Sequence, residues 1–522
     1  MTQEPGELYL VVILSVLLSC VAAWTIAHRY RRRIRQLMRA PLAGDSRNSN
    51  VLAASQAADC PTATPVSLAD NHNAGMRLTM LLIALSCLLA VSSACIWWAL
   101  TFPGEPLPPK RVAVMALLHL WPLVPALALT WRWSRKRLFG MLLLWCAATF
   151  IVFLWRQIEF RPLQALAAMA SEIGLSLAFL SLVFLGNATR AIAPWLFMPA
   201  ALLVWSSLAG LHAMNYIGGG QSPFLTSLIK LLDPLLGWLP WYALLLLFVS
   251  LPWVLAWWPA RVLGRALGRA YSRKWLSDLP VVFTGVWIFA LTDRAVMVVD
   301  RAGAGALAMY LPLLWIPMVM LIGDRWRPRR ERPPTLLVLR VFQQDSQTQS
   351  LYDQVVERWR LSGNTVLIAG TDLADRTLDA DDIFRFLDRK LAGRFIVSPS
   401  DVPRRISELD MTTDMDGRYR VNKCYCHDTT WQDALQALVR CSNVVLMDLR
   451  GFHAHNAGCR YELTTLAQES RDLRVVVLTD ERTDLTAAKE AVASGRQERF
   501  TWIEASHFNA SKRRQVLMCL FS

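Results

Sequence analysis

The chain has 522 residues, of which 54% are hydrophobic and 22 are tryptophan. This composition is too apolar for a single soluble globule of this size. The formal net charge of +15 is compatible with nucleic-acid binding, but most of the excess lies in arginine clusters beside hydrophobic runs. Charges in that position set membrane orientation and meet anionic lipid headgroups. We therefore expect a lipid bilayer as the partner of the basic residues, and no nucleic acid.

Hydrophobic runs fill the first part of the chain, whereas charged residues mix evenly after Pro334. About nine of these runs have the ~20 residues needed to cross about 30 Å of hydrocarbon. They lie near 9–28, 78–100, 112–131, 138–155, 167–187, 192–211, 238–258, 280–298 and 303–322. In the first of them the basic cluster follows the apolar run, so we interpret it as an anchor and not as a signal peptide. We predict an α-helical polytopic membrane bundle at 1–324.

Lysine and arginine are unevenly divided among the loops that connect the predicted spans. With about nine crossings, the large basic clusters all fall on one side of the membrane. They lie at 29–39, 132–137, 261–274 and 325–332. Cytoplasmic loops carry such an excess. We therefore predict a protein of the cell inner (plasma) membrane with its N-terminus outside and its C-terminal part in the cytoplasm.

Ionisable residues inside predicted spans are candidates for a function of the bundle, because a charge in lipid is costly. Glu172 and the adjacent pair Asp293 and Arg294 are of this kind. The pair is expected near the outer end of its helix, where both side chains reach headgroups or neutralise each other. No broken-helix pair of the kind that marks a transporter's substrate site is apparent. A transporter or channel regulated by the cytoplasmic part remains one open interpretation.

A basic, proline-containing linker at 325–334 precedes a predicted soluble domain at 335–522. Short continuous apolar runs indicate strands that are buried on both faces. These runs lie at 335–342, 365–370, 443–449, 474–479 and 501–504. Helical patterns alternate with them at 350–361, 381–391, 430–439, 459–469 and 484–493. The alternation predicts a cytoplasmic α/β domain with a doubly wound parallel sheet.

Ligands of such sheets bind outside the carboxyl ends of the strands, where the strand order reverses. Polar residues follow the predicted strands at these places. They give a predicted cofactor-binding set of Gln344, Asp345, Gly370, Asp372, Asp448 and Arg450. No metal site is predicted: Cys424 and Cys426 lack zinc-ligand spacing and fit a partly buried strand, and 414–417 lacks the terminal glutamate of a calcium loop.

The third predicted strand, its loop and the next helix resemble a Toll/interleukin-1 receptor (TIR) domain. The sequence over 444–463 is VVLMDLRGFHAHNAGCRYEL. In it Cys459, Glu462 and Leu463 match the family's cysteine and Glu-Leu pair, and Gly458 stands where the family has a tryptophan. Two earlier stretches agree with this order, LRVFQQD at 339–345 and GTD at 370–372.

The resemblance implies a TIR/flavodoxin-like fold with NAD as a substrate or ligand. In TIR domains that cleave NAD, a glutamate of this helix is the catalytic residue beside the nicotinamide ribose. The resemblance implies this role for Glu462. A carboxylate there suits an oxocarbenium-like transition state. The resemblance also implies self-association and a signalling role in stress or defence. Two alternatives stay open: a non-enzymatic adaptor or receptor, and Glu462 as an ordinary first-turn residue stabilised by the helix dipole.

Overall fold

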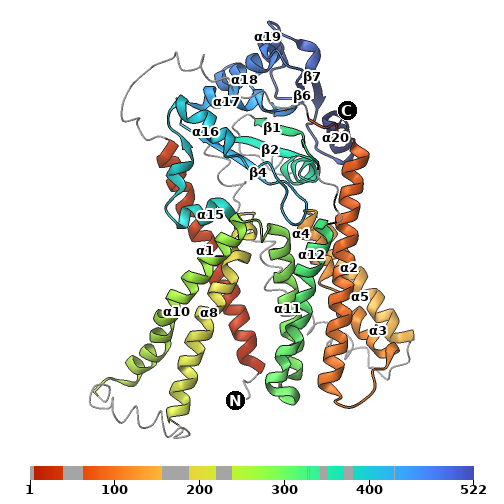
Figure 1. The fold of residues 1–522 in the computed structure, drawn as a ribbon, viewed down its shortest axis with the longest axis vertical. Coiled ribbons are helices and arrows are strands. Elements are labelled where there is room, and N and C mark those ends of the chain that lie inside the picture. The colour runs from red at the N-terminus through yellow and green to blue at the C-terminus, as the bar shows by residue number, and fades with distance from the viewer. Residues whose placement is uncertain are drawn as a thin grey trace.

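The molecule has a bundle of long helices at one end and an α/β domain at the other (Figure 1). The structure is a computed structural model. It describes residues 5–38, 63–133, 135–155, 187–218, 238–325, 327, 330–340, 351–369, 380–427 and 429–521. The N-terminus lies at the far end of the bundle, and the C-terminus lies beside the α/β domain. This arrangement agrees with the predicted division into an apolar helical part and a C-terminal α/β part.

The bundle consists of helices that present large apolar side chains to the outside. They are α1 (Pro5–Met38), α2 (Leu68–Thr101), α3 (Pro109–Leu118), α4 (Leu123–Thr130), α5 (Arg135–Trp155), α8 (Asn187–Gly218), α10 (Trp241–Ser272), α11 (Asp278–Ala302), η2 (Gly303–Leu314) and α12 (Trp315–Arg325). By length and composition, five helices of the described part could cross a membrane, or six if the bent pair α3–α4 is one span. This number is smaller than the nine spans that the sequence predicts.

Two features account for part of the difference in span number. The predicted span at 167–187 lies outside the described residues. The segment Asp278–Arg325 counts once, with 48 residues, although its chain turns back at Gly303, which has a φ of +54°. Beyond that turn Gly305 lies against Leu100, and Gly323 lies against Leu81. Therefore η2 and α12 run antiparallel to α2.

The predicted span at 112–131 is a broken helix and not a continuous one. Helices α3 and α4 meet at an angle of 41°. Pro122 lies in the break and is the residue just before α4. Proline has no backbone N–H and disfavours helical geometry in the residue before it, which explains why the helix stops here. The break places His119 against α2, where its Nδ1 lies 2.9 Å from Ser93 Oγ.

Helices α1 and α2 connect the bundle to the α/β domain. Each has 34 residues, or about 50 Å of length, whereas a bilayer's hydrocarbon is about 30 Å thick. Their surplus rises along opposite sides of the α/β domain (Figure 1). On α1 the hydroxyl of Tyr30 lies 2.8 Å from that of Tyr425. On α2 the Asn71 side-chain amide donates to the carbonyl of Arg358 and to Ser362 Oγ.

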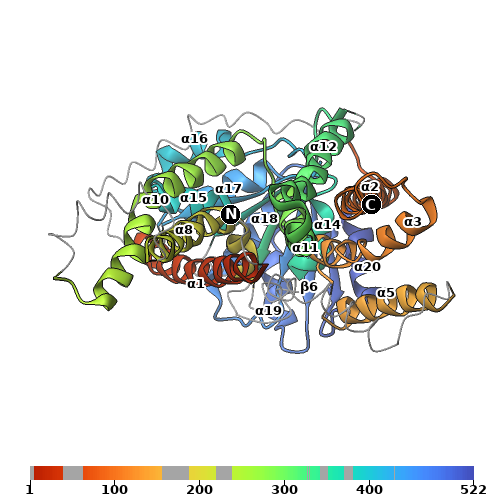
Figure 2. The same ribbon diagram turned by 90° about the horizontal axis from the view of Figure 1, so that it is seen from below.

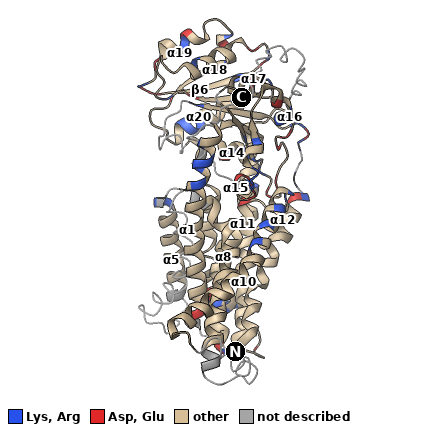
Figure 3. Ribbon diagram, turned by 90° about the vertical axis from the view of Figure 1, so that its left-hand side faces the viewer, with Lys and Arg blue, Asp and Glu red and all other residues tan. Residues whose placement is uncertain are grey.

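A view from below shows how the bundle is divided (Figure 2). Helices α1, α8 and α10 lie on one side, α2, α3 and α5 lie on the other, and α11 stands between them. Charged residues are sparse along the bundle and gather where it meets the α/β domain (Figure 3). The apolar length and the position of the charges are those expected of a membrane-spanning bundle.

The α/β domain is built on one sheet of seven parallel strands in the order β3-β4-β2-β1-β5-β6-β7. The strands are β1 (Thr335–Arg340), β2 (Asn364–Ala369), β3 (Phe395–Ile396), β4 (Val421–Cys426), β5 (Val444–Asp448), β6 (Arg474–Thr479) and β7 (Phe500–Glu504). The prediction of a parallel α/β sheet is confirmed. Strand β4 contains Cys424 and Cys426, as expected, whereas the two-residue β3 was not predicted.

Helices and short turns connect these strands. They are η3 (Tyr352–Val356), α14 (Glu357–Trp359), α15 (Ala380–Leu387), η5 (Leu391–Arg394), η6 (Pro399–Asp401), α16 (Val402–Ser407), α17 (Trp431–Arg440), α18 (Ala457–Gln468), α19 (Leu485–Val492), η7 (Gln497–Arg499) and α20 (Ala510–Phe521). Strand residues alternate between the sheet's faces. Leu337 and Val445 pack with α17, α18 and α19. On the other face, Leu336 and Leu446 belong to a cluster that includes Tyr30 of α1, α14 and α20.

Glu357 joins the bundle to the α/β domain through three arginines. Its carboxylate lies 3.0 Å from Arg360, 3.4 Å from Arg132 at the end of the bundle, and 3.5 Å from Arg418. Burial opposes ionisation, but Arg360, Arg132 and Arg418 prevail and lower the pKa of Glu357 to about 2. Arg418 also pairs with Asp416, and Arg132 is partly exposed, so Arg360, which is buried, depends most on this carboxylate.

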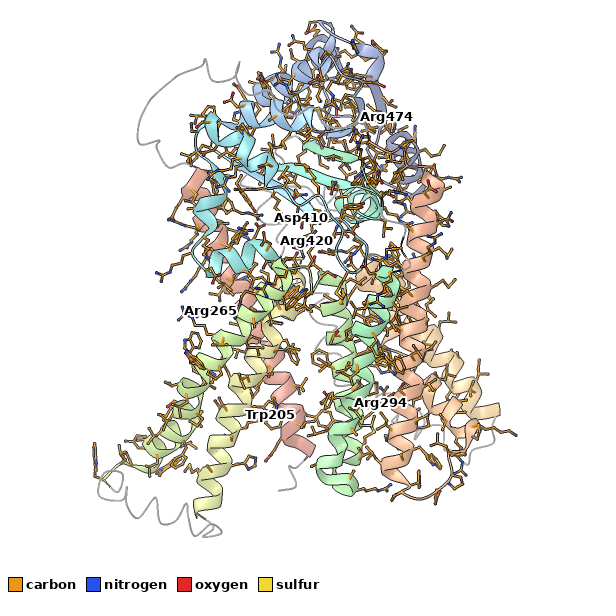
Figure 4. The ribbon with its side chains drawn as sticks, viewed as in Figure 1. Trp205, Arg265, Arg294, Asp410, Arg420 and Arg474 are labelled. Carbon is orange, nitrogen blue, oxygen red and sulfur yellow. The ribbon has the colours of Figure 1, made fainter. Side chains whose placement is uncertain are left out.

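A second set of contacts holds the loop at 410–420 against the bundle. Lys274 lies 2.6 Å from Asp410, and Arg420 donates to the carbonyl of Tyr271 at 2.8 Å. Figure 4 shows Asp410 and Arg420 between the sheet and the helices. The acidic residues of 414–417 are engaged here: Asp414 accepts from Arg420 and Asp416 from Arg418.

We predict that Glu357→Gln destabilises the full chain by about 3–5 kcal/mol, because it removes the carboxylate that pairs with the buried Arg360. Thermal unfolding of the detergent-solubilised protein measures the effect. Glu408→Gln is the matched control, since Glu408 is half exposed and pairs with Arg405, so its loss costs within about 1 kcal/mol. Equal unfolding temperatures for the two variants would contradict the assigned role of Glu357.

Candidate functional site

The strand order reverses between β1 and β5. From β1 the sheet continues through β2, β4 and β3, and from β5 it continues through β6 and β7 in the opposite direction. In open parallel sheets, the carboxyl ends of the two strands at this point border the usual ligand crevice. Here these ends are Arg340 and Asp448, which are register partners across the β1–β5 pair.

Asp448 and Arg450 form a buried ion pair at this edge. The Arg450 guanidinium donates to both carboxylate oxygens, with Nε–Oδ1 and Nη2–Oδ2 distances of 2.7 Å. The turn between strand and loop uses Gly451 with a φ of +71°, a conformation that glycine adopts without strain. The amide of Gly451 donates to Asp480 after β6. The loops that follow β5 and β6 are thereby tied together.

Arg340 is a functional candidate that the sequence analysis missed. It ends β1, it is buried, and it stands opposite Asp448. The signal was present in the sequence, because Arg340 is the single charged residue of the apolar run 335–340. A charge in a strand that is buried on both faces requires a partner. The pairing of β1 with β5, which the sequence does not give, is what places Arg340 at the switch point.

Glu462 lies in the second turn of α18, since that helix begins at Ala457 and has no acidic residue in its first turn. The interpretation as a first-turn residue stabilised by the dipole is therefore wrong. Its side chain is 5% exposed, and Oε2 is buried without a hydrogen-bond partner in the described part of the chain. Burial raises the pKa of Glu462 to about 8. Burial, with a smaller effect of Glu462, also raises the pKa of Cys459 to about 12.

Most buried polar atoms are hydrogen-bonded, so a buried carboxyl oxygen without a partner, such as Oε2 of Glu462, is unusual. Such groups concentrate at functional sites. The surroundings of Glu462 are apolar: Cys459 and Leu463 of the same helix pack under the sheet. The helix itself follows β5, so Glu462 and the Asp448–Arg450 pair lie on one strand–loop–helix unit.

Trp431 of α17 covers the start of α18. A Cβ at Gly458 would lie 3.9 Å from the Trp431 ring, and the ring also packs edge-to-face on Tyr461 with centroids 5.4 Å apart. Gln436 donates to the Tyr461 hydroxyl. The first two turns of α18, which carry Glu462, are thus fixed by an aromatic residue of the neighbouring helix.

The structure brings together only part of the predicted binding set. Asp448 and Arg450 are in contact, and Glu462 belongs to the same connection. The remaining members lie outside the described residues. They are Gln344, Asp345, Gly370 and Asp372.

Burial of the ionisable pair contradicts one of its two predicted roles, contact with lipid headgroups, whereas mutual neutralisation of the two charges stays a prediction. Asp293 and Arg294 are 1% and 0% exposed, so neither reaches the lipid surface. The Tyr9 hydroxyl of α1 donates to Asp293 at 2.6 Å, and Arg294 acts electrostatically on His119 at the α3–α4 break. Figure 4 shows Arg294 among the helices of the bundle. Glu172, the third candidate, lies outside the described residues.

We expect Glu462→Gln to change how stability depends on pH. The folded protein holds a proton on Glu462 up to about pH 8, whereas an unfolded glutamate releases it near pH 4.3. Stability from this group is therefore complete below about pH 4 and is lost as pH rises towards 8. As the pH rises through this range, from about 4 to about 8, the unfolding temperature of Glu462→Gln should fall less than that of the wild-type protein. The exposed Glu490→Gln variant should follow wild type, and parallel curves for all three proteins would refute the assignment.

Comparison with known proteins gives no relative from which a function could be transferred. No family model, no characterised protein and no solved structure matches this chain. The function of the site is therefore inferred from its own geometry and chemistry.

Proposed function

We propose that this is a membrane-anchored signalling protein of stress or defence, whose α/β domain binds a nicotinamide nucleotide at the carboxyl ends of β1 and β5. The observation that carries the proposal is the group Arg340, Asp448 and Arg450 at the point where the strand order reverses. Two guanidinium groups and one carboxylate there suit a ligand that has both phosphates and ribose hydroxyls.

The chemistry of the three side chains fits a dinucleotide. Guanidinium groups bind phosphate oxygens in a bidentate manner. A phosphate that takes Arg450 frees Asp448, which then accepts hydrogen bonds from ribose hydroxyls, the role that acidic residues have in other doubly wound nucleotide sites. Without a ligand, Asp448 and Arg450 therefore neutralise each other. A ligand with phosphates and ribose hydroxyls replaces this ion pair with contacts of its own.

The topology supports a TIR-like, flavodoxin-like identity for the domain. The strands β2-β1-β5-β6-β7 follow one another like the 2-1-3-4-5 order of flavodoxin-like sheets, and β4 and β3 extend the β2 edge. TIR domains carry a tryptophan where this chain has Gly458. Here the Trp431 ring packs over that position, and we take it as a replacement from the neighbouring helix.

Hydrolysis of the nicotinamide bond requires an ionised Glu462. A carboxylate stabilises the positive charge that develops on the ribose as the bond breaks. In the described conformation burial keeps this group protonated at neutral pH. We propose that self-association of the domain, promoted by its confinement to a membrane, rearranges α18 and ionises Glu462. The protein is then an enzyme only when assembled.

The membrane part completes the proposal. We propose about nine crossings in the inner (plasma) membrane, with the N-terminus outside and the α/β domain in the cytoplasm. Basic residues of the bundle support this orientation, because Arg132 and Lys274 meet the α/β domain and positive charge favours the cytoplasmic side.

The nucleotide site is tested with the full chain in detergent micelles at high protein concentration. We expect NAD to bind and nicotinamide to be released, with Glu462→Gln lowering the release rate by about 100-fold or more while binding persists. Arg340→Gln should weaken NAD binding by about 10-fold, the effect of losing one charged hydrogen bond. Glu490→Gln on the exposed face of α19 is the control.

The outcomes separate the alternatives. Binding without nicotinamide release, or equal release by Glu462→Gln, leaves a nucleotide-regulated adaptor and rejects the enzyme. Absence of NAD binding by the wild-type chain rejects the whole nucleotide proposal in favour of a protein-binding module.

The orientation is tested by cysteine labelling in intact cells. Glu105 lies between α2 and α3, at the end of the bundle away from the α/β domain, and Glu408 lies in that domain; both are exposed. A membrane-impermeant maleimide should label Glu105→Cys above the wild-type background in sealed cells. It should label Glu408→Cys only after permeabilisation. The reverse pattern would place the α/β domain outside.

A further inference from the structure

Helix α10 ends in a row of four arginines. Its first ~20 residues carry no charge and match the thickness of the hydrocarbon. Arg261, Arg265, Arg269 and Arg273 then follow at every fourth position, the last just after the helix. All four are exposed. Residues four apart are neighbours on a helix surface, so they form one arginine row, about 18 Å long.

The arginine row is not neutralised within the described part of the chain. None of its four side chains forms an ion pair or hydrogen bond with a described residue; the one contact is that of Arg273 with the Trp275 ring, at 5.3 Å. Figure 4 shows Arg265 pointing away from the helices. Adjacent like charges on a helix repel. A row of this kind is stable where anions outside the chain surround it.

Another face of α10 docks the α/β domain, so the row has no role in that contact. A Cβ at Gly268 would lie 3.1 Å from the Phe384 ring of α15. Tyr271 is buried under Arg420, whose guanidinium lies 4.0 Å from its ring. Lys274, by contrast, is paired with Asp410. The chain therefore uses its basic residues selectively: some hold the domain, and the arginine row faces outwards.

The first two arginines of the row, Arg261 and Arg265, lie at the depth of lipid headgroups. Trp257 and Trp258, which immediately precede it, are 53% and 72% exposed, and exposed tryptophans gather at the membrane interface. The headgroup layer adds about 6 Å or more beyond the hydrocarbon on each side. Arg261 and Arg265, one turn apart, fall within it, and any tilt of α10 brings Arg269 closer. Long side chains of this type also bend towards the interface.

We propose that the arginine row binds the headgroups of anionic phospholipids in the leaflet next to the α/β domain. Guanidinium groups match phosphate oxygens in geometry as well as in charge. The chain just after the neighbouring α15 carries two further exposed basic residues, Arg389 and Lys390. The arginine row is distinct from the nucleotide site that we propose at the carboxyl ends of β1 and β5, and its side chains are exposed.

Helix α15, which packs on α10 at Gly268, is itself anchored to the sheet. Asp382 of α15 is fully buried and accepts hydrogen bonds from Tyr425 at 2.7 Å and from Arg394 at 3.0 Å, and it pairs with Lys423. Tyr425 and Lys423 belong to β4.

The proposal is tested by the amount of phosphatidylglycerol that the full chain retains in phosphatidylcholine micelles. Each arginine near an anionic surface contributes about 1 kcal/mol. The triple variant Arg261→Gln, Arg265→Gln, Arg269→Gln should therefore lower the apparent affinity for phosphatidylglycerol by about 100-fold. The charge-matched control removes three exposed basic residues at the other end of the bundle. It is Lys110→Gln, Arg111→Gln, Arg301→Gln, and it should retain phosphatidylglycerol like wild type.

Unfolding temperatures in pure phosphatidylcholine check that the triple variant is folded. If it is not, Arg265→Gln alone should lower the affinity about 5-fold, and Arg265→Lys should restore most of it. Wild-type retention by the folded triple variant, or an equal loss in the control, overturns the proposal. So does unchanged lipid retention accompanied by the loss of a bound acidic protein, which would assign the row to that partner.

Discussion

An apolar sheet face has to be covered, and in this protein a helix of the apolar bundle contributes to the cover. Strands β1, β2, β4, β5 and β6 are buried on both faces, as a parallel sheet requires. Helices α17, α18 and α19 cover one face. On the other, α14 and α20 share one apolar cluster with Tyr30 and Ile34 of α1. The α/β domain is therefore not an independent globule joined by a flexible tether. Its core is continuous with a helix that enters the bundle.

The charges at the junction follow from the same constraint. Basic residues of the bundle lie where it meets the α/β domain. Once the domain covers them, they need counter-ions, and Glu357 and Asp410 provide these for Arg132 and Lys274. Buried ion pairs add little net stability, since desolvation offsets the attraction, but removing one partner is costly. They therefore fix the position of the domain on the bundle.

The same low-dielectric interior accounts for the state of the candidate site. Glu462 has no compensating charge in its apolar surroundings, so it holds its proton at neutral pH. Asp448, in contrast, is paired with Arg450 through two hydrogen bonds. Two carboxyl groups on one strand–loop–helix unit thus have opposite environments. The proposed ionisation of Glu462 requires α18 to move. Such a movement breaks the ring contact between Trp431 and Tyr461.

The sequence by itself determined the division into an apolar helical part and a parallel α/β part, because hydrophobic length and strand–helix alternation are local properties. It also pointed to Asp448 and Arg450, whose spacing is that of a turn after a buried strand. Only the tertiary structure paired β1 with β5 and so placed Arg340 opposite Asp448. It also shows that Asp293 and Arg294 are buried, that the chain breaks between α3 and α4 at Pro122, and that Glu462 lies in the second turn of α18. These features depend on which surfaces meet, and periodicity carries no information about partners that are distant in the chain.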